Sequence, residues 1–142
     1  MYNICELLSK SKTIAVVGIS HNPSKISRKI ARFLFDEGYE VFGVNPSLAG
    51  NTVDGINVYK SITDIPHNID IVNVFRRSED IPELIDDVLL KMPKALWLQQ
   101  GIRNDIAVKP VIEKGIITIQ DECIFVQYNY CKSQNKIERN RL

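Results

Sequence analysis

The chain has 142 residues, of which 44% are hydrophobic and 25% charged, and its formal net charge is +1. This length and composition indicate one globular domain, and a charge so close to neutral argues against non-specific nucleic-acid binding as the main task. No apolar run approaches the roughly 20 residues of a membrane span, and the N-terminus lacks the pattern of a signal peptide.

The three cysteines, Cys5, Cys123 and Cys131, are odd in number and lack the spacing of metal ligands. This pattern predicts neither a metal site nor a disulfide framework. Together with the absence of a targeting segment, it favours a cytoplasmic protein.

The first elements follow from hydrophobic spacing. Ile4, Leu7 and Leu8 share one face of a short N-terminal helix that ends near Lys12. A β-branched apolar run then predicts a strand over Thr13–Val17. An amphipathic helix follows over about 24–37, and Gly38 suits its left-handed C-terminal position.

A second strand is expected over Glu40–Val44, because the proline of Asn45-Pro46 cannot continue a central strand. The polar, glycine-containing stretch Ser47–Val58 is typical of a surface loop. A short turn or helix at Ser61–Ile65 then leads into a third strand over Ile69–Phe75.

The remaining pattern repeats this alternation. Ser78 is a candidate N-cap for a helix over about 79–91, whose early acidic residues suit its dipole. A fourth strand follows at 95–98, a helix at about 104–114, and a fifth strand at 116–120. We therefore expect one domain over 1–128, and a polar, flexible tail over 129–142.

Strands that are continuously apolar and alternate with helices predict an α/β fold with a Rossmann-like, doubly wound parallel sheet. The simplest order of the five strands is 3-2-1-4-5, with helices on both faces. Ligands of such sheets bind outside the carboxyl ends of the strands where the order reverses, which here predicts a crevice between the first and fourth strands.

The first strand, the turn at Gly18 and the following helix start form an arrangement that presents backbone N–H groups to an anion. A dinucleotide fingerprint would continue G-x-G-x-x-G, but Ser20 and Pro23 replace its second and third glycines. Asn45 stands where a dehydrogenase carries the acid that binds the ribose. The pattern therefore disfavours NAD and suits a nucleotide with an additional phosphate near its ribose, which a carboxylate would repel.

Four segments carry a resemblance to a known family: Val16–Ser20, Val44–Pro46, Ile71–Ser78 and Trp97–Ile102. In this order and spacing they resemble the small stand-alone CoA-binding proteins, which are relatives of the CoA-binding domain in the succinyl-CoA synthetase alpha subunit. The resemblance covers about Thr13 to Cys123, and its V-F-R-R-S and W-L-Q-x-G blocks are the specific part.

The resemblance implies a Rossmann-like domain that binds coenzyme A, or an acyl-CoA, through its strand-end loops. It implies no defined reaction. The phosphorylated histidine of the synthetases lies in a second domain without a counterpart here, so neither His21 nor His67 is assigned that role. The candidate CoA-contacting residues are Gly18, Ser20, Lys25, Ser27, Arg28, Asn45, Pro46, Ser47, Phe75, Arg76, Gln99, Gln100 and Gly101.

Each candidate has an alternative, purely structural role. Gly18 either lets a pyrophosphate approach the backbone or is needed for packing, and Ser27 either donates to a phosphate or caps the helix. Lys25, Arg28 and Lys29 oppose the dipole at a helix start, which favours an anionic ligand there. The glutamines at 99 and 100 either reach the pantetheine arm or hold the loop, and Arg77 can pair with Glu79 or Asp80 instead.

Two positions depart from the family pattern. Ser47 stands where lysine is common, so a phosphate contact is either missing or supplied by Lys60, and Glu122 replaces the arginine of a D-R-C segment. Cys123 near the end of the fifth strand is either a buried structural thiol or able to form a mixed disulfide with CoA.

The leading hypothesis is a non-catalytic or regulatory module that binds CoA or an acyl-CoA. An acyl-CoA-processing enzyme, or a subunit of a split acyl-CoA synthetase, is the alternative, although no Ser-His-Asp or Cys-His arrangement is recognisable. An NAD(H)-binding redox sensor is the least favoured. No nucleic-acid or membrane partner is expected, and the sequence leaves open a homodimer or another protein partner.

Overall fold

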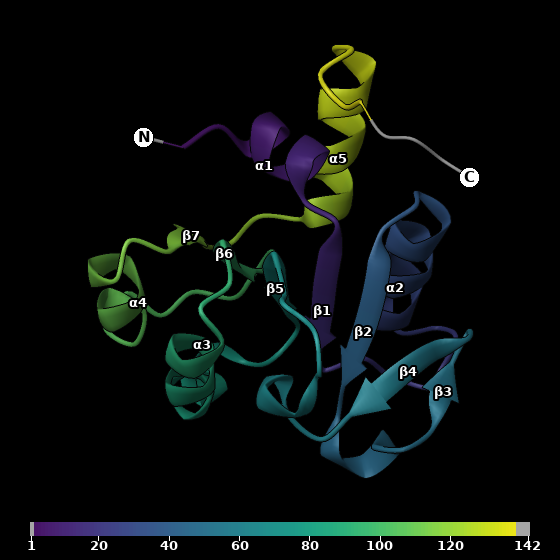
Figure 1. Ribbon diagram of the computed structural model, residues 1–142, viewed down its shortest axis with the longest axis vertical. Coiled ribbons are helices and arrows are strands. Elements are labelled where there is room, and N and C mark those ends of the chain that lie inside the picture. Colours follow the sequence, from purple (N-terminus) through teal and green to yellow (C-terminus); the bar gives the residue numbers. More distant parts are fainter. Residues whose placement is uncertain (1, 139–142) are drawn as a thin grey trace.

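A computed structural model describes residues 2–138 and shows a seven-stranded sheet between two layers of helices (Figure 1). The strand order is β3-β4-β2-β1-β5-β6-β7, and every neighbouring pair is parallel except β3 with β4. The strands are β1 (Thr13–Val17), β2 (Glu40–Val44), β3 (Thr52–Val53), β4 (Ile56–Tyr59), β5 (Ile71–Val74), β6 (Ala95–Leu98) and β7 (Ile117–Ile119). The predicted α/β class with a Rossmann-like, doubly wound sheet is confirmed.

The predicted strand order was wrong in one respect. The stretch expected to be a surface loop, 47–58, contains a hairpin of β3 and β4, and β4 occupies the place beside β2 that was predicted for the third strand. The strand expected there is β5, which instead pairs directly with β1. The order therefore reverses between β1 and β5, and the crevice lies there and not beside the strand at 95–98.

The missed hairpin had a sequence signal. Asp54 and Gly55 form its two-residue turn, and both have positive φ angles, 52° and 80°. An Asp-Gly pair between strands is typical of this type of turn, because both positions favour left-handed backbone. Burial then alternates along β4, which rests on the core through Ile56 and Val58.

The helices are α1 (Ile4–Lys10), α2 (Ile26–Asp36), α3 (Ile85–Lys91), α4 (Lys109–Glu113) and α5 (Ile124–Ser133), with 3-10 turns η1 (Pro46–Leu48), η2 (Ile62–Asp64) and η3 (Ser78–Leu84). The helix predicted over 79–91 begins as η3, and Pro82 lies inside it. Proline has no N–H to donate within an α-helix. Ser78 is not an N-cap, because its hydroxyl accepts a hydrogen bond from the Arg103 N–H at 3.0 Å.

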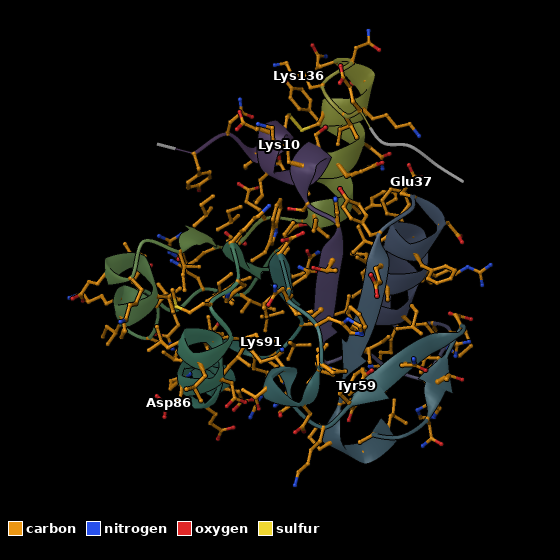
Figure 2. The ribbon with its side chains drawn as sticks, in the orientation of Figure 1. Lys10, Glu37, Tyr59, Asp86, Lys91 and Lys136 are labelled. Carbon is orange, nitrogen blue, oxygen red and sulfur yellow. A yellow bond between two sulfur atoms is a disulfide. The ribbon has the colours of Figure 1, made fainter. Side chains whose placement is uncertain are left out.

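Alternate residues of each strand face two separate cores. Val16 and Trp97 belong to the core under α1, α2 and α5, whereas Val17 and Leu98 belong to the core under α3, α4 and η2. On the second face, Lys91 in the last turn of α3 donates to the carbonyl of Ile65 after η2 (Figure 2). The parallel strands are buried on both sides, which accounts for their continuously apolar sequences.

The carboxyl-terminal segment differs from the expected tail. Helix α5 continues to Ser133, and its Tyr128 and Cys131 are buried in the first core. Cys131 forms a disulfide with Cys5 in α1, which contradicts the prediction of no disulfide framework. Residues 139–142 of the predicted tail lie outside the described residues.

Within residues 2–138, no helix combines the length and apolar character needed to cross a membrane. The same part of the chain contains no group of three or more His, Cys, Asp or Glu side chains placed to hold a metal ion.

Candidate functional site

Four predicted site residues lie side by side at the carboxyl edge of the sheet. They are Gly18 directly after β1, Asn45 after β2, Phe75 after β5 and Gln99 after β6. Backbone hydrogen bonds continue the sheet at this edge: the Gly18 N–H donates to Val44 O and the Phe75 N–H to Val17 O, each at 2.8 Å. We call this group of loops the strand-end site.

Gly18 is required by the fold itself. Its φ is +91°, a backbone conformation that other residues rarely adopt. A Cβ atom at this position would lie 3.0 Å from the Phe75 carbonyl oxygen. The backbone at Phe75 therefore fills the space that a side chain at position 18 would need. Gly18 thus has the packing role that the sequence analysis considered as its structural alternative.

The loop between β1 and α2 is shaped by its own short side chains. Ser20 Oγ accepts a hydrogen bond from the Asn22 N–H, and Asn22 Oδ1 accepts one from the Ser24 N–H, both at 3.0 Å. Lys25 is the N-cap of α2 and makes no side-chain capping hydrogen bond. Ser27 is therefore not the cap; it lies in the first turn and is buried, at 5% exposure. The first N–H groups of α2 thus have no side-chain acceptor at the cap.

The three cations near this helix start have different surroundings. Arg28 is half-buried and forms a bidentate ion pair with Asp54 in the β3–β4 turn, with both N–O distances at 3.0 Å. Arg28 also donates to the carbonyl of His21. Its hydrogen bonds hold the pKa of Asp54 below its usual value. Lys25 and Lys29 are exposed, and neither pairs with a carboxylate of residues 2–138.

The loop after β2 is organised by Asn45. Its Nδ2 donates to Ile19 O at 2.9 Å, and its Oδ1 accepts from the Ser47 N–H at 2.9 Å. The amide thereby joins this loop to the loop that follows β1. Pro46 and Ser47 begin η1 and are exposed.

A cavity of about 140 Å³ lies beneath the ends of β1 and β2. Its positive lining residues are Lys60 and Arg76, and its negative ones are Asp80, Glu83 and Asp87. Sequence reasoning did not find the acidic wall, although Glu83 and Asp87 are four residues apart, a spacing that places side chains on one helical face.

The outward pairing considered for Arg77 is confirmed. Its guanidinium group contacts Asp80 at 3.0 Å and Glu79 at 3.6 Å.

Gln99 is turned into the protein. It is only 4% exposed, and its Oε1 accepts from Asn73 Nδ2 at 3.2 Å and from the Ile124 N–H at 2.9 Å. Its side chain holds α5 to β5 and β6, which is the structural alternative considered above. Gln100 and Gly101 are exposed, and the Gly101 N–H donates to Asp121 Oδ1 at 2.6 Å.

The remaining candidates lie at the margins of the site. Cys123 is a half-buried free thiol at the N-cap of α5, and Glu122 accepts from Gln127 on the surface. His21 is exposed in the loop after β1. His67 precedes β5 and stacks on Phe42 with ring centres 5.1 Å apart.

Comparison with known proteins places this architecture in context. A family model described as a CoA binding domain matches residues 12–129. The uncharacterized protein YneT of Bacillus subtilis (strain 168) is 40% identical over 91% of this chain and 94% of its own length. A solved structure of cell-free ID.343 from Thermus thermophilus is 34% identical, covers 91% of this chain and 98% of its own, and superposes with a TM-score of 0.87.

A larger protein contains the same fold. The dinucleotide forming acetyl-coenzyme A synthetase 1 of Ca. Korarchaeum cryptofilum, at 23% identity, matches 84% of this chain and 28% of its own length with a TM-score of 0.69. At this identity the likeness shows the fold alone. From the family match and the relatives above 30% identity, the chain belongs to the CoA-binding domain family.

Proposed function

We propose that the protein binds coenzyme A or an acyl-CoA at the strand-end site, as a non-catalytic or regulatory module. The observation that carries the proposal is the start of α2, where a helix without a side-chain cap stands beside the exposed cations Lys25 and Lys29, which pair with no carboxylate of residues 2–138. Cations at a helix start oppose the dipole unless an anion lies between them. Phosphate groups are anions of this kind.

The rest of the strand-end site suits the other parts of such a ligand. Asn45 is neutral, so the loop after β2 does not repel a phosphorylated ribose as a carboxylate would. Lys60 and Arg76 add positive charge in the adjoining cavity. Half-buried Phe75 and exposed Gln100 offer apolar contact and hydrogen bonds for a pantetheine arm.

Five of the predicted residues take different roles on this basis. We assign direct contact with the ligand to the exposed Lys25 and to the backbone of the loop after β1. Arg28, Asn45 and Gln99 shape the site through their bonds to Asp54, Ile19 and Ile124. Gly18 permits the close approach of two strand-end loops.

Isothermal titration of ligand-stripped protein with CoA, dephospho-CoA and NAD tests the proposal. We expect CoA to bind and NAD to give no signal. Removal of the 3′-phosphate should weaken binding by about tenfold or more, since a lost charged contact is worth about 1.5–3 kcal/mol. Acetyl-CoA should bind without loss of its thioester, whereas hydrolysis or acyl transfer would favour the enzyme alternative. The absence of a binding signal with every one of these ligands would contradict the proposal.

A charge variant tests the position of the site. The double substitution Lys25→Gln and Lys29→Gln should weaken CoA binding by about tenfold or more, because two positive charges beside the phosphates are lost. Lys114→Gln is the matched control, since Lys114 is an exposed cation after α4 at the opposite edge of the sheet. If the double variant and the control bind CoA with equal affinity, the start of α2 is not part of the binding site.

A further inference from the structure

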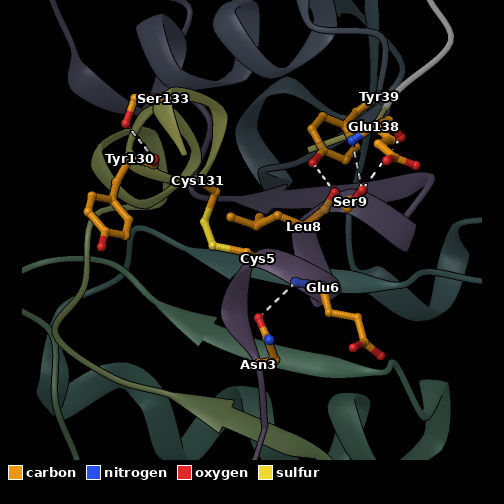
Figure 3. Close-up of a disulfide and its surroundings, with 10 residues drawn as sticks. All are labelled: Asn3, Cys5, Glu6, Leu8, Ser9, Tyr39, Tyr130, Cys131, Ser133 and Glu138. Atoms are coloured by element: carbon orange, nitrogen blue, oxygen red, sulfur yellow. Dashed lines mark hydrogen bonds between the residues drawn. A yellow bond between two sulfur atoms is a disulfide. The ribbon is translucent and has the colours of Figure 1, made fainter. Parts of the chain in front are cut away.

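The two ends of the described chain are joined by the disulfide between Cys5 and Cys131 (Figure 3). Their Cα atoms are 5.4 Å apart although 126 positions separate them in sequence. Cys5 lies in the first turns of α1, and Cys131 lies in the last turns of α5. The bond therefore connects two helices that meet at the edge of the sheet opposite the strand-end site.

The non-covalent anchors of α1 are concentrated in its second half. Leu7 and Leu8 are buried in the first core, and the Tyr39 hydroxyl donates to the Leu8 carbonyl. Ser9 Oγ accepts from the Glu138 N–H at 3.0 Å (Figure 3). This half of the helix is held by several contacts with distant parts of the chain.

The first turn of α1 has fewer contacts with distant parts of the chain than the second half. Asn3 and Glu6 are exposed, and the capping hydrogen bond from the Glu6 N–H to Asn3 Oδ1 is local to the turn. Ile4 is half-buried against the core, and Cys5 supplies the covalent tie. A helix of seven residues is far too short to be stable alone. Its first turn therefore depends on the disulfide more than its second half does.

The same turn forms part of one wall of a cavity of about 930 Å³. Tyr2 and Asn3, just before α1, and Glu6, Leu7 and Lys10 of α1 line this wall. Ile112 of α4 and Ile117 of β7 line it from the other side. A change in the first turn of α1 would thus alter this cavity.

The two cysteine residues of the disulfide differ in burial. Cys5 is half-buried and lines a second cavity of about 380 Å³ between α1 and residues 135–138, whereas Cys131 is fully buried. A thiolate can reach Cys5 through this cavity. It would form a mixed disulfide with Cys5 and displace Cys131 as the thiolate.

We propose that the Cys5–Cys131 disulfide is a redox latch that holds the first turn of α1 in place and thereby maintains the cavity beside β7. A dithiol opens the latch in two steps. Its first thiolate attacks Cys5 Sγ and displaces Cys131. Its second thiolate then attacks the reductant's own sulfur in the mixed disulfide, which releases Cys5 as the thiolate and the reductant as a cyclic disulfide. Two electrons and two protons pass from the dithiol to the protein, whose Cys5 and Cys131 become thiols.

Hydrogen exchange of the oxidised and dithiothreitol-reduced protein, followed by mass spectrometry, tests this latch. At labelling times too short for global unfolding to expose the core, we expect peptides covering residues 2–8 of the reduced protein to exchange about tenfold faster, while peptides from β1 and β5 stay protected. Cys5→Ser should reproduce the reduced pattern without reductant. Cys123→Ser, which removes the half-buried free thiol, is the matched control and should match the oxidised wild type.

Equal exchange of residues 2–8 in both redox forms would overturn the latch, and so would loss of protection throughout the sheet at these short labelling times. A titration with CoA keeps this test separate from the proposed function. The latch and the strand-end site lie at opposite edges of the sheet, as the separation of Lys10 and Lys136 from Tyr59 illustrates (Figure 2). CoA affinity should therefore be the same in both redox forms.

Discussion

At the scale of single residues, Gly18 connects the fold to the strand-end site. Its left-handed backbone brings the loop after β1 against the Phe75 carbonyl. Gly18→Ala should lower the free energy of unfolding by about 2 kcal/mol, because a strained φ angle and a close contact are combined. Urea denaturation measures the effect.

Gly115→Ala is the matched control for this prediction. Its φ is +82°, but nothing lies within 4 Å of the added Cβ, so only the backbone cost of about 1 kcal/mol is expected. Equal destabilisation by the two substitutions would mean that the Phe75 carbonyl moves aside without cost.

At the scale of elements, the Arg28–Asp54 ion pair holds the β3–β4 hairpin against α2. Because the bonds from Arg28 lower the pKa of Asp54 in the folded protein, the pair contributes stability above the unfolded pKa of about 3.9. That contribution is lost as the pH falls through the lower, folded pKa. Stability should therefore decline below about pH 4.

Asp54→Asn checks this prediction, because asparagine tolerates the left-handed turn but carries no charge. In urea denaturation between pH 6 and pH 2, the variant should be less stable at pH 6 and should lose less stability on acidification. Glu6→Gln, which removes an exposed i,i+4 pair with Lys10, serves as the control. An identical pH profile for Asp54→Asn and the wild type would contradict the assignment.

At the scale of the whole molecule, the disulfide closes a loop that spans nearly the entire chain. Cross-links of this length restrict the unfolded state strongly, so reduction should lower the free energy of unfolding by roughly 3–5 kcal/mol. Guanidinium denaturation with and without dithiothreitol measures the change. A midpoint that does not move would show that the unfolded chain gains little freedom, and Cys123→Ser should retain the full effect of reduction.

The strand-end site and the disulfide region lie in different parts of the molecule. The strand-end site is built from loops that follow the parallel strands, whereas the latch and its cavity belong to α1, α5 and the edge strand β7. We therefore expect the proposed binding at the first and the proposed redox change at the second to be independent, so that both can be tested in one set of variants.

The sequence by itself determined most of the elements, the fold class and the family. The bounds of β1, β2 and β6 were predicted as they occur, since each is a short apolar run that ends at a glycine, an asparagine or a polar pair. The alternation of such runs with amphipathic helices established the α/β class. The V-F-R-R-S and W-L-Q-x-G blocks were the specific evidence for the family, because they are continuous segments at strand ends that can be recognised without the tertiary structure.

Only the tertiary structure decided which distant residues meet. Nothing local distinguishes Arg28 as the partner of Asp54, turns Gln99 inward towards Ile124, or brings Cys5 to Cys131. These contacts depend on strand order and helix packing. The observed strand order differs from the predicted one because the hairpin with the Asp54-Gly55 turn occupies the place beside β2. Periodicity and turn chemistry act over a few residues, whereas pairing across the sheet is settled by the burial of the whole chain.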